Sequence, residues 1–180
     1  MIALDFTLES PERVSSLVWV AGGVGGLEGP PPPKEVGELF AEMDRLWDAK
    51  DWEALAELDA RVFVDGFRSP GERADPAVRR QVVEWDLDNY RTIHGVEGRP
   101  VPLDPPADGR LGGIAVPTLA IWGDADEPGV AHAGERLVSA VPGARRHVFP
   151  GVAHMVNLER PTEFERVVLD FLAEVDAAGA

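Results

Sequence analysis

The feature that most constrains the fold is an alternation of short apolar runs and helical patterns in the last third of the chain. Residues 118–122 and 146–149 have the character of strands, whereas residues 131–140 and the segment that begins near Pro161 carry apolar residues at helical spacing. A strand–helix–strand–helix order with short connections favours parallel pairing through right-handed crossovers. We therefore predict an α/β fold with a parallel sheet.

The N-terminal part of the chain adds one helix and one strand. Residues 1–8 have apolar residues at helical spacing, so we expect a helix with Ile2, Ala3, Phe6 and Leu8 on one face, which would be buried. The nearly all-apolar run 16–21 that follows is typical of a strand buried on both faces of a parallel sheet. The predicted core therefore has about three parallel strands with flanking helices.

A long helical segment separates the first strand from the other two. A Gly-rich stretch and four consecutive prolines precede it, and apolar residues recur every three to four positions in segments 36–62 and 78–93. We assign residues 1–24 and 110–180 to the α/β core. Residues 25–109 are assigned to a helical insert with Pro/Gly-rich linkers at both ends.

Composition narrows the class of protein and of partner. Hydrophobic residues make up 44% and charged residues 27% of the chain, the balance of a globular domain rather than a disordered one. The net charge of −15 disfavours nucleic acid and anionic membrane surfaces as partners. No apolar run approaches the ~20 residues that a membrane-crossing helix needs. Because the chain has no cysteine, thiolate chemistry is excluded, and we expect a cytoplasmic location.

Two loops carry the residues best suited to chemistry. The loop after the 118–122 strand contains Asp124 and Asp126, and the loop after the 146–149 strand contains His154. In a parallel sheet both loops lie at the carboxyl edge, where open α/β sheets bind their ligands. An aspartate there can hold a histidine in one tautomer and stabilise it once protonated, as a serine–histidine–aspartate triad requires.

The sequence around these residues resembles motifs of the α/β-hydrolase fold family. Residues 116–126 resemble the strand and turn that carry the triad acid, and residues 151–161 resemble the histidine loop, a G-x-x-H followed by a proline-started helix. Residues 11–18 are similar to the family's link into the strand after the nucleophile helix. The resemblance implies that Asp126 is the triad acid, that His154 is the general base, and that the insert occupies the place of the family's cap.

The family's nucleophile motif, G-x-S-x-G, is absent from this sequence. None of its serines sits in a glycine-flanked turn; they are Ser10, Ser15, Ser16, Ser69 and Ser139. In the family the nucleophile turn is followed by a helix much like residues 1–4, so the resemblance implies the C-terminal part of a hydrolase that begins one or two residues after the nucleophile. We expect such a chain to be inactive alone, because the nucleophile and the oxyanion hole are both missing.

Two functions follow from this interpretation. The first is hydrolysis of a small-molecule ester, lactone or C–C bond by a Ser-His-Asp triad of which this chain supplies two members. Epoxides and haloalkanes stay open, because the family members that act on them usually have an aspartate nucleophile. The alternative is a non-catalytic module, derived from a degenerate hydrolase, that binds a ligand or a partner protein. The edge of the Ser16–Ala21 strand, which in the family pairs with a further strand, suggests self-association.

We expect no cofactor and no metal. His94, His132 and His147 show no ligand spacing, and a metal site needs several clustered ligands. The glycines of residues 22–26 lack the Lys-Ser/Thr of a phosphate-binding loop, so we interpret them as the path from the sheet to the insert. Asp124 is interpreted as a turn former or as a residue that supports the acid.

Overall fold

The computed structural model shows strands β1, β2 and β3 separated by helices, with a long run of helices between β1 and β2. The structure describes residues 2–29, 31–68, 73–93, 98 and 101–179. The elements, in chain order, are the helices and strands α1 Ile2–Glu9, η1 Pro11–Arg13, β1 Leu17–Val20, α2 Lys34–Ala49, α3 Trp52–Asp59, η2 Ala60–Val64, α4 Pro76–Ile93, η3 Ala107–Gly113, β2 Thr118–Gly123, α5 Pro128–Ala140, β3 Arg145–Phe149, α6 Val156–Glu159 and α7 Pro161–Gly179. Ser69 and His94, named above, lie outside the described residues.

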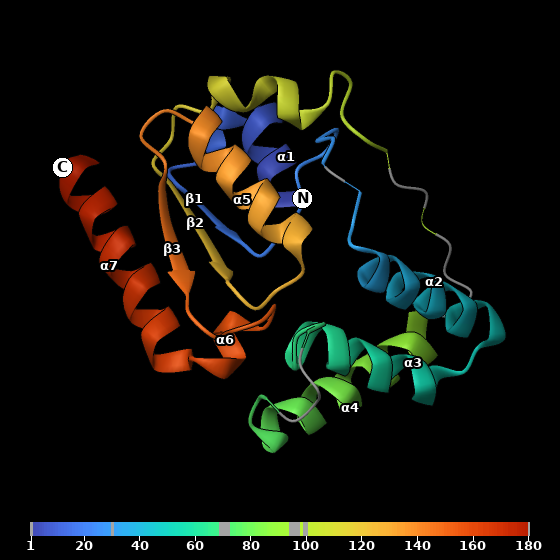
Figure 1. Ribbon diagram of the computed structural model, residues 1–180. Coiled ribbons are helices and arrows are strands. Elements are labelled where there is room, and N and C mark those ends of the chain that lie inside the picture. Colours follow the sequence, from blue (N-terminus) through green and yellow to red (C-terminus); the bar gives the residue numbers. More distant parts are fainter. Residues whose placement is uncertain (1, 30, 69–72, 94–97, 99–100, 180) are drawn as a thin grey trace.

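The described strands form one parallel sheet in the order β1-β2-β3, as the sequence predicts. Leu17 of β1 lies beside Thr118 of β2, and Leu119 of β2 lies beside Arg145 of β3. The central strand β2 is buried along its entire length, because it has a neighbour on each side and helices over both faces. The prediction of an α/β fold with three parallel strands and flanking helices is confirmed (Figure 1).

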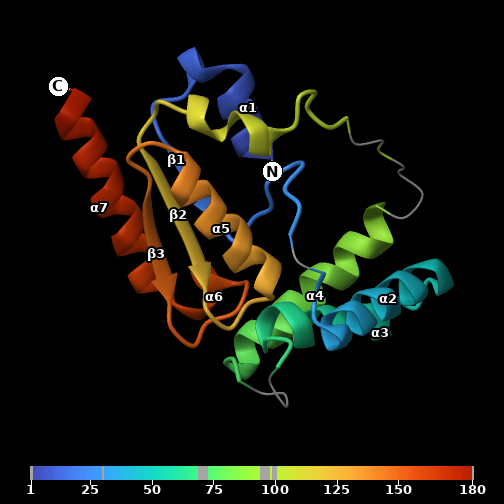
Figure 2. The ribbon, with the colours of Figure 1, turned by 45° about the horizontal axis from the view of Figure 1, so that its top comes forward.

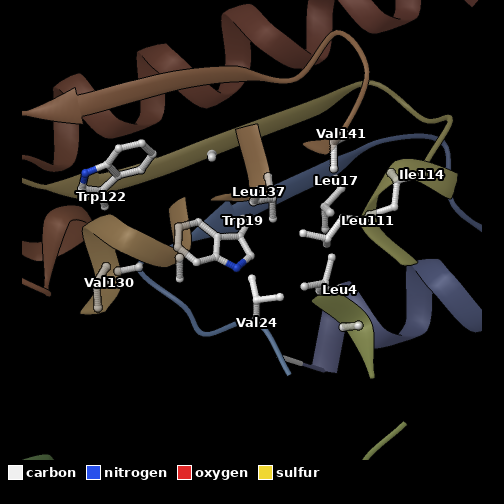
Figure 3. Packing of buried hydrophobic residues seen from close by; sticks show 14 residues of the cluster. Leu4, Leu17, Trp19, Val24, Leu111, Ile114, Trp122, Val130, Leu137 and Val141 are labelled. Carbon is white, nitrogen blue, oxygen red and sulfur yellow. The ribbon is translucent and has the colours of Figure 1, made fainter. Parts of the chain in front are cut away.

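One face of the sheet is covered by α1, α5 and η3, which bury a continuous apolar cluster against it (Figure 3). Two tryptophans from neighbouring strands, Trp19 and Trp122, meet edge to face with ring centroids 6.4 Å apart. The other large residues of this cluster are Leu4, Leu17, Val24, Leu111, Ile114, Val130, Leu137 and Val141. A core of this size accounts for the close packing of α5 on β2.

The opposite face is covered by α6 and α7, and this cover does not extend over the whole of β1. The buried residues on this side come mainly from β2, β3 and α7, with Val18 only partly buried against them. Val20 is 37% exposed. The prediction that residues 16–21 form a strand buried on both faces is therefore wrong for this side, because α7 runs along β3 rather than along β1 (Figure 1).

The buried face of α1 also differs from the prediction. The helix forms as expected, but Ile2 is 88% exposed and Phe6 is exposed, whereas Leu4 and Thr7 are buried. Apolar residues occur almost all round this helix, so their spacing cannot decide which side faces the core. The orientation is set by packing on β1 and η3.

The helices α2, α3 and α4, together with η2, form a group beside the carboxyl ends of the strands (Figure 2). We call this group the helical insert. Its own apolar cluster, which includes Ala60, Val64 and Val82, extends to Met155, just before α6, and to Leu158 of α6. None of the described helices is long and apolar enough to cross a lipid bilayer.

Candidate active site

Asp126 and His154 meet at the carboxyl edge of the sheet. Asp126 follows the end of β2 by three residues, and His154 follows the end of β3 by five. His154 Nδ1 lies 2.8 Å from Asp126 Oδ2. The other carboxylate oxygen, Asp126 Oδ1, accepts the Glu127 N–H at 2.7 Å. The Asp126 side chain is 1% exposed, whereas that of His154 is 30% exposed, so the acid is held inside while the imidazole reaches the surface.

Backbone hydrogen bonds join the two loops. Ala125 donates its N–H to the Val152 carbonyl at 2.9 Å, and Asp124 donates its N–H to the Phe149 carbonyl at 3.1 Å. The Asp124 carboxylate accepts the Gly151 N–H at 2.6 Å. Asp124 therefore braces the histidine loop instead of contacting the imidazole.

Gly123, the last residue of β2, is required by the close approach of the histidine loop. A Cβ at this position would lie 2.0 Å from the Val152 carbonyl oxygen and 2.5 Å from that of Ala153. Both contacts are with backbone atoms, which cannot move aside without displacing His154. The glycine thus allows the acid loop and the histidine loop to pack directly on each other.

His154 lines a cavity of about 370 Å³ that is bordered by the segment after β1, the start of α5 and the helical insert. The insert contributes two phenylalanines, Phe40 from α2 and Phe63 from η2, whose rings are stacked with centroids 6.5 Å apart. The Phe63 ring lies 5.2 Å from the His154 imidazole, centroid to centroid. A mostly apolar cavity with a few polar side chains in its wall, among them His132 and His154, is suited to a small organic molecule.

The sequence did not reveal the two phenylalanines as site residues. Phe40 fits the apolar helical pattern of its segment, so spacing alone assigns it to a core. Phe63 lies in η2, a π-helical turn that widens the helix after α3 and breaks the regular spacing. A π-turn often occurs at a functional site, but periodicity in a sequence does not reveal it.

The other residues considered for binding lie in different surroundings. His132 of α5 lines the same cavity as His154, and Gly22 and Gly23 line it as well. His147 lies on β3 against the Phe149 ring, with Glu163 3.9 Å away. Among the described residues, no group of three or more His, Cys, Asp or Glu side chains is placed to hold a metal ion.

The arrangement is suited to proton transfer. The buried carboxylate of Asp126 fixes the Nδ1 side of His154, which leaves Nε2 as the atom that can take or give a proton. The imidazole borders a mostly apolar cavity, so a substrate bound there would lie next to the His154 ring.

Known proteins resemble this chain over nearly its whole length. No family model matches the chain. The chain is 32% identical over 174 residues to the 2-hydroxy-6-oxononadienedioate/2-hydroxy-6-oxononatrienedioate hydrolase of Klebsiella pneumoniae; the match covers 95% of the chain and 58% of that relative.

Solved structures of esterases also resemble nearly the whole chain and cover it with only part of their own length. A thermophilic esterase is 27% identical, with a TM-score of 0.63, over 97% of the chain and 62% of that protein. The esterase RhEst1 from Rhodococcus sp. ECU1013 is 18% identical, with a TM-score of 0.71, over 96% of the chain and 61% of that protein. The chain thus spans about three fifths of the length of the proteins that it matches. By sequence and by fold, the chain belongs to the α/β-hydrolase fold family.

Proposed function

We propose that this chain supplies the acid and the general base of a Ser-His-Asp triad, with Asp126 as the acid and His154 as the base. The observation that carries the proposal is the 2.8 Å contact between His154 Nδ1 and the buried carboxylate of Asp126. In the reaction, His154 Nε2 would take the proton of a serine hydroxyl as the serine attacks an acyl carbon, and would return it to the leaving group. The sequence contains no G-x-S-x-G, so a separate segment would supply the nucleophile.

The proposed substrate is a small molecule with an ester, lactone or activated C–C bond. The range follows the similar proteins, which include a hydrolase named for a dienedioate, two esterases and an enol-lactonase. The apolar wall formed by Phe40 and Phe63 supports a substrate with an apolar portion next to the scissile bond.

A chimera tests this proposal. The N-terminal remainder of the Klebsiella pneumoniae relative, joined to this chain, would be assayed for turnover of p-nitrophenyl acetate. We expect turnover that falls about 10³-fold or more in His154→Ala and in Asp126→Ala. His132→Ala is the matched control, because it removes an imidazole from the same cavity that does not contact Asp126. A folded chimera that is inactive, or one whose activity survives His154→Ala, would contradict the proposal.

A second candidate function is that of a non-catalytic module that associates through β1. The two edges of the sheet differ in a way that favours this candidate. The β3 edge carries Arg145, Arg146 and His147, whereas β1 consists of Leu17–Val20, which are all apolar. Charged residues on an edge strand oppose pairing with another chain, and an apolar edge favours it. Pairing of two β1 strands would give a symmetric dimer.

Size-exclusion chromatography with light scattering tests the association. We expect the unmodified chain to elute as a dimer or larger species, and Val20→Lys to shift it toward the monomer, because Val20 is exposed on that strand. Leu169→Lys on α7 is the control, since it places the same charge at an exposed apolar position away from β1. A monomer at high concentration in the unmodified chain would exclude this candidate.

We also propose the division of the chain into residues 1–24 and 110–180 as the core and residues 25–109 as the cap. Limited proteolysis tests this division, because cleavage should concentrate near its two boundaries.

We also propose a cytoplasmic location, because the chain has no cysteine. Cell fractionation tests this location.

A further inference from the structure

We propose that Arg73 is a positioning residue for His154: it ties the helical insert to the histidine loop and thereby holds the imidazole against Asp126. The proposal builds on the function proposed above for His154. It names a residue outside the triad, in the segment between η2 and α4, that would control the geometry of the triad.

The guanidinium of Arg73 joins two parts of the fold that are far apart in sequence. On the insert side, its Nε donates to the Asp65 carbonyl at 2.8 Å and its Nη2 to the Val64 carbonyl at 2.6 Å. On the core side, its Nη1 donates to the Gly151 carbonyl and its Nη2 to Glu159 Oε1 at 2.7 Å. A planar guanidinium with several fixed donors can hold four acceptors at once, which an ammonium cannot do in the same geometry.

The core-side partners of Arg73 lie on both sides of His154 in sequence. Gly151 precedes the histidine by three residues and Glu159 follows it by five. Glu159 Oε1 also accepts the Ala153 N–H at 3.0 Å, so the oxygen that binds Arg73 is the one that fixes the residue next to His154. The Glu159 side chain is 7% exposed, and such an ion pair is less screened by water than a surface pair.

The insert contacts the histidine directly as well. His154 donates its backbone N–H to the Phe63 carbonyl at 3.0 Å, and Phe63 directly precedes the residues whose carbonyls Arg73 holds. The apolar cluster of the insert packs on Met155, the residue after His154. Arg73 thus fixes both the acceptor of the His154 N–H and the loop that carries it.

Hydrogen exchange and NMR test the proposal on the chain as it exists. The readouts are the exchange rates of the Ala153 and His154 amides and the downfield Nδ1–H resonance of His154, which reports its hydrogen bond to Asp126. In Arg73→Met we expect both amides to exchange about tenfold faster or more, as for the loss of one charge-assisted hydrogen bond, and the resonance to weaken. Arg73→Lys should give exchange rates and a resonance intensity between those of the unmodified chain and those of Arg73→Met.

Two controls separate positioning from general stability. Arg145→Met breaks an exposed ion pair with Glu174 at the start of β3 and should leave all three signals unchanged. The Ile121 amide in the central strand is an internal reference, because loss of overall stability would accelerate its exchange too. Asp126→Asn identifies the Nδ1–H resonance.

Unchanged signals in Arg73→Met, or an equal acceleration at Ile121, would overturn the proposal. If Arg73→Met does not fold, Arg73→Lys and Glu159→Gln provide the same readouts with smaller changes in the fold, and the same two results overturn it. None of these measurements needs a nucleophile or a substrate. An inactive chimera would therefore count against the proposed function without affecting the conclusion about Arg73. Unchanged signals in Arg73→Met would count against the role of Arg73 without affecting the proposed function.

Discussion

At the scale of single residues, the site depends on glycines that let backbone segments touch. Gly66, just after η2, has φ +88°, and a Cβ there would lie 2.9 Å from the Ala125 carbonyl oxygen in the acid loop. We expect Gly66→Ala to lower the free energy of unfolding by about 2 kcal/mol, because an L-residue is strained at this φ and the contact is with backbone. Urea unfolding measures the effect.

Gly37 provides the matched control for that substitution. It lies inside α2, and a Cβ there would meet no atom within 4 Å. Gly37→Ala should raise the free energy of unfolding by about 0.5–1 kcal/mol, because alanine favours a helix interior. Equal changes in the free energy of unfolding for Gly66→Ala and Gly37→Ala would show that the contact between Gly66 and the acid loop does not require a glycine.

The sequence predicts that Asp126 and His154 form a pair, whereas it gives no sign of the insert residues that contact their loops. Asp126 and His154 each follow a strand at the edge where ligands bind, a local feature that a sequence shows. Arg73 and Phe63 contact segments about 80–90 residues away, and no spacing in the sequence encodes such contacts.

At the scale of elements, the insert contains a carboxyl group with a displaced pKa. Burial, and then the charge of the neighbouring Asp59, raise the pKa of Asp86 on α4 from its ordinary value of 3.8 to about 6. Because the folded chain holds this proton more tightly than the unfolded chain, the group favours folding below pH 4, and that contribution is lost as the pH rises through about 6.

Asp86→Asn should remove the decrease in folding stability that ionisation of Asp86 causes as the pH rises through about 6. We expect the variant to be more stable than the unmodified chain at pH 7, by about 1 kcal/mol after screening by solvent, and not more stable at pH 4. Urea unfolding across this pH range measures the difference. Asp88→Asn, an exposed position on the same helix, is the control and should give no such trend. If the free energies of unfolding of Asp86→Asn and the unmodified chain change in parallel with pH, the raised pKa is not that of Asp86.

The end of α2 allows a second prediction at this scale. Lys50 caps the helix in the left-handed region, with φ 59°, and its N–H reaches the carbonyls of Leu46 and Trp47. Lys50→Gly should raise the free energy of unfolding by about 0.5–1 kcal/mol, because glycine adopts this φ without a Cβ clash. Ala49→Gly, one residue earlier in the helix, should lower it by about 1 kcal/mol. Urea midpoints that move the same way would refute this explanation.

At the scale of the whole molecule, the chain combines a contacting Asp126–His154 pair with an apolar strand at one edge of the sheet. We expect the chain alone to hydrolyse p-nitrophenyl acetate no faster than buffer, and His154→Ala to give the same rate, because the sequence has no G-x-S-x-G to supply a nucleophile and half of an oxyanion hole. Turnover by the chain alone that His154→Ala abolishes would mean that a nucleophile is present within it.

The sequence by itself determined the alternation of strands and helices, the parallel sheet, and the two residues proposed as acid and base. The strands, the helices and the sheet follow from local patterns of apolar runs and helical spacing, whereas the choice of Asp126 and His154 also rests on the resemblance of their loops to α/β-hydrolase motifs. The tertiary structure decided which side of α1 faces the core, how far α7 covers β1, and which insert residues reach His154. Each of these depends on contacts between segments distant in sequence, whose free energy is set by how surfaces pack and not by the residues of either segment alone.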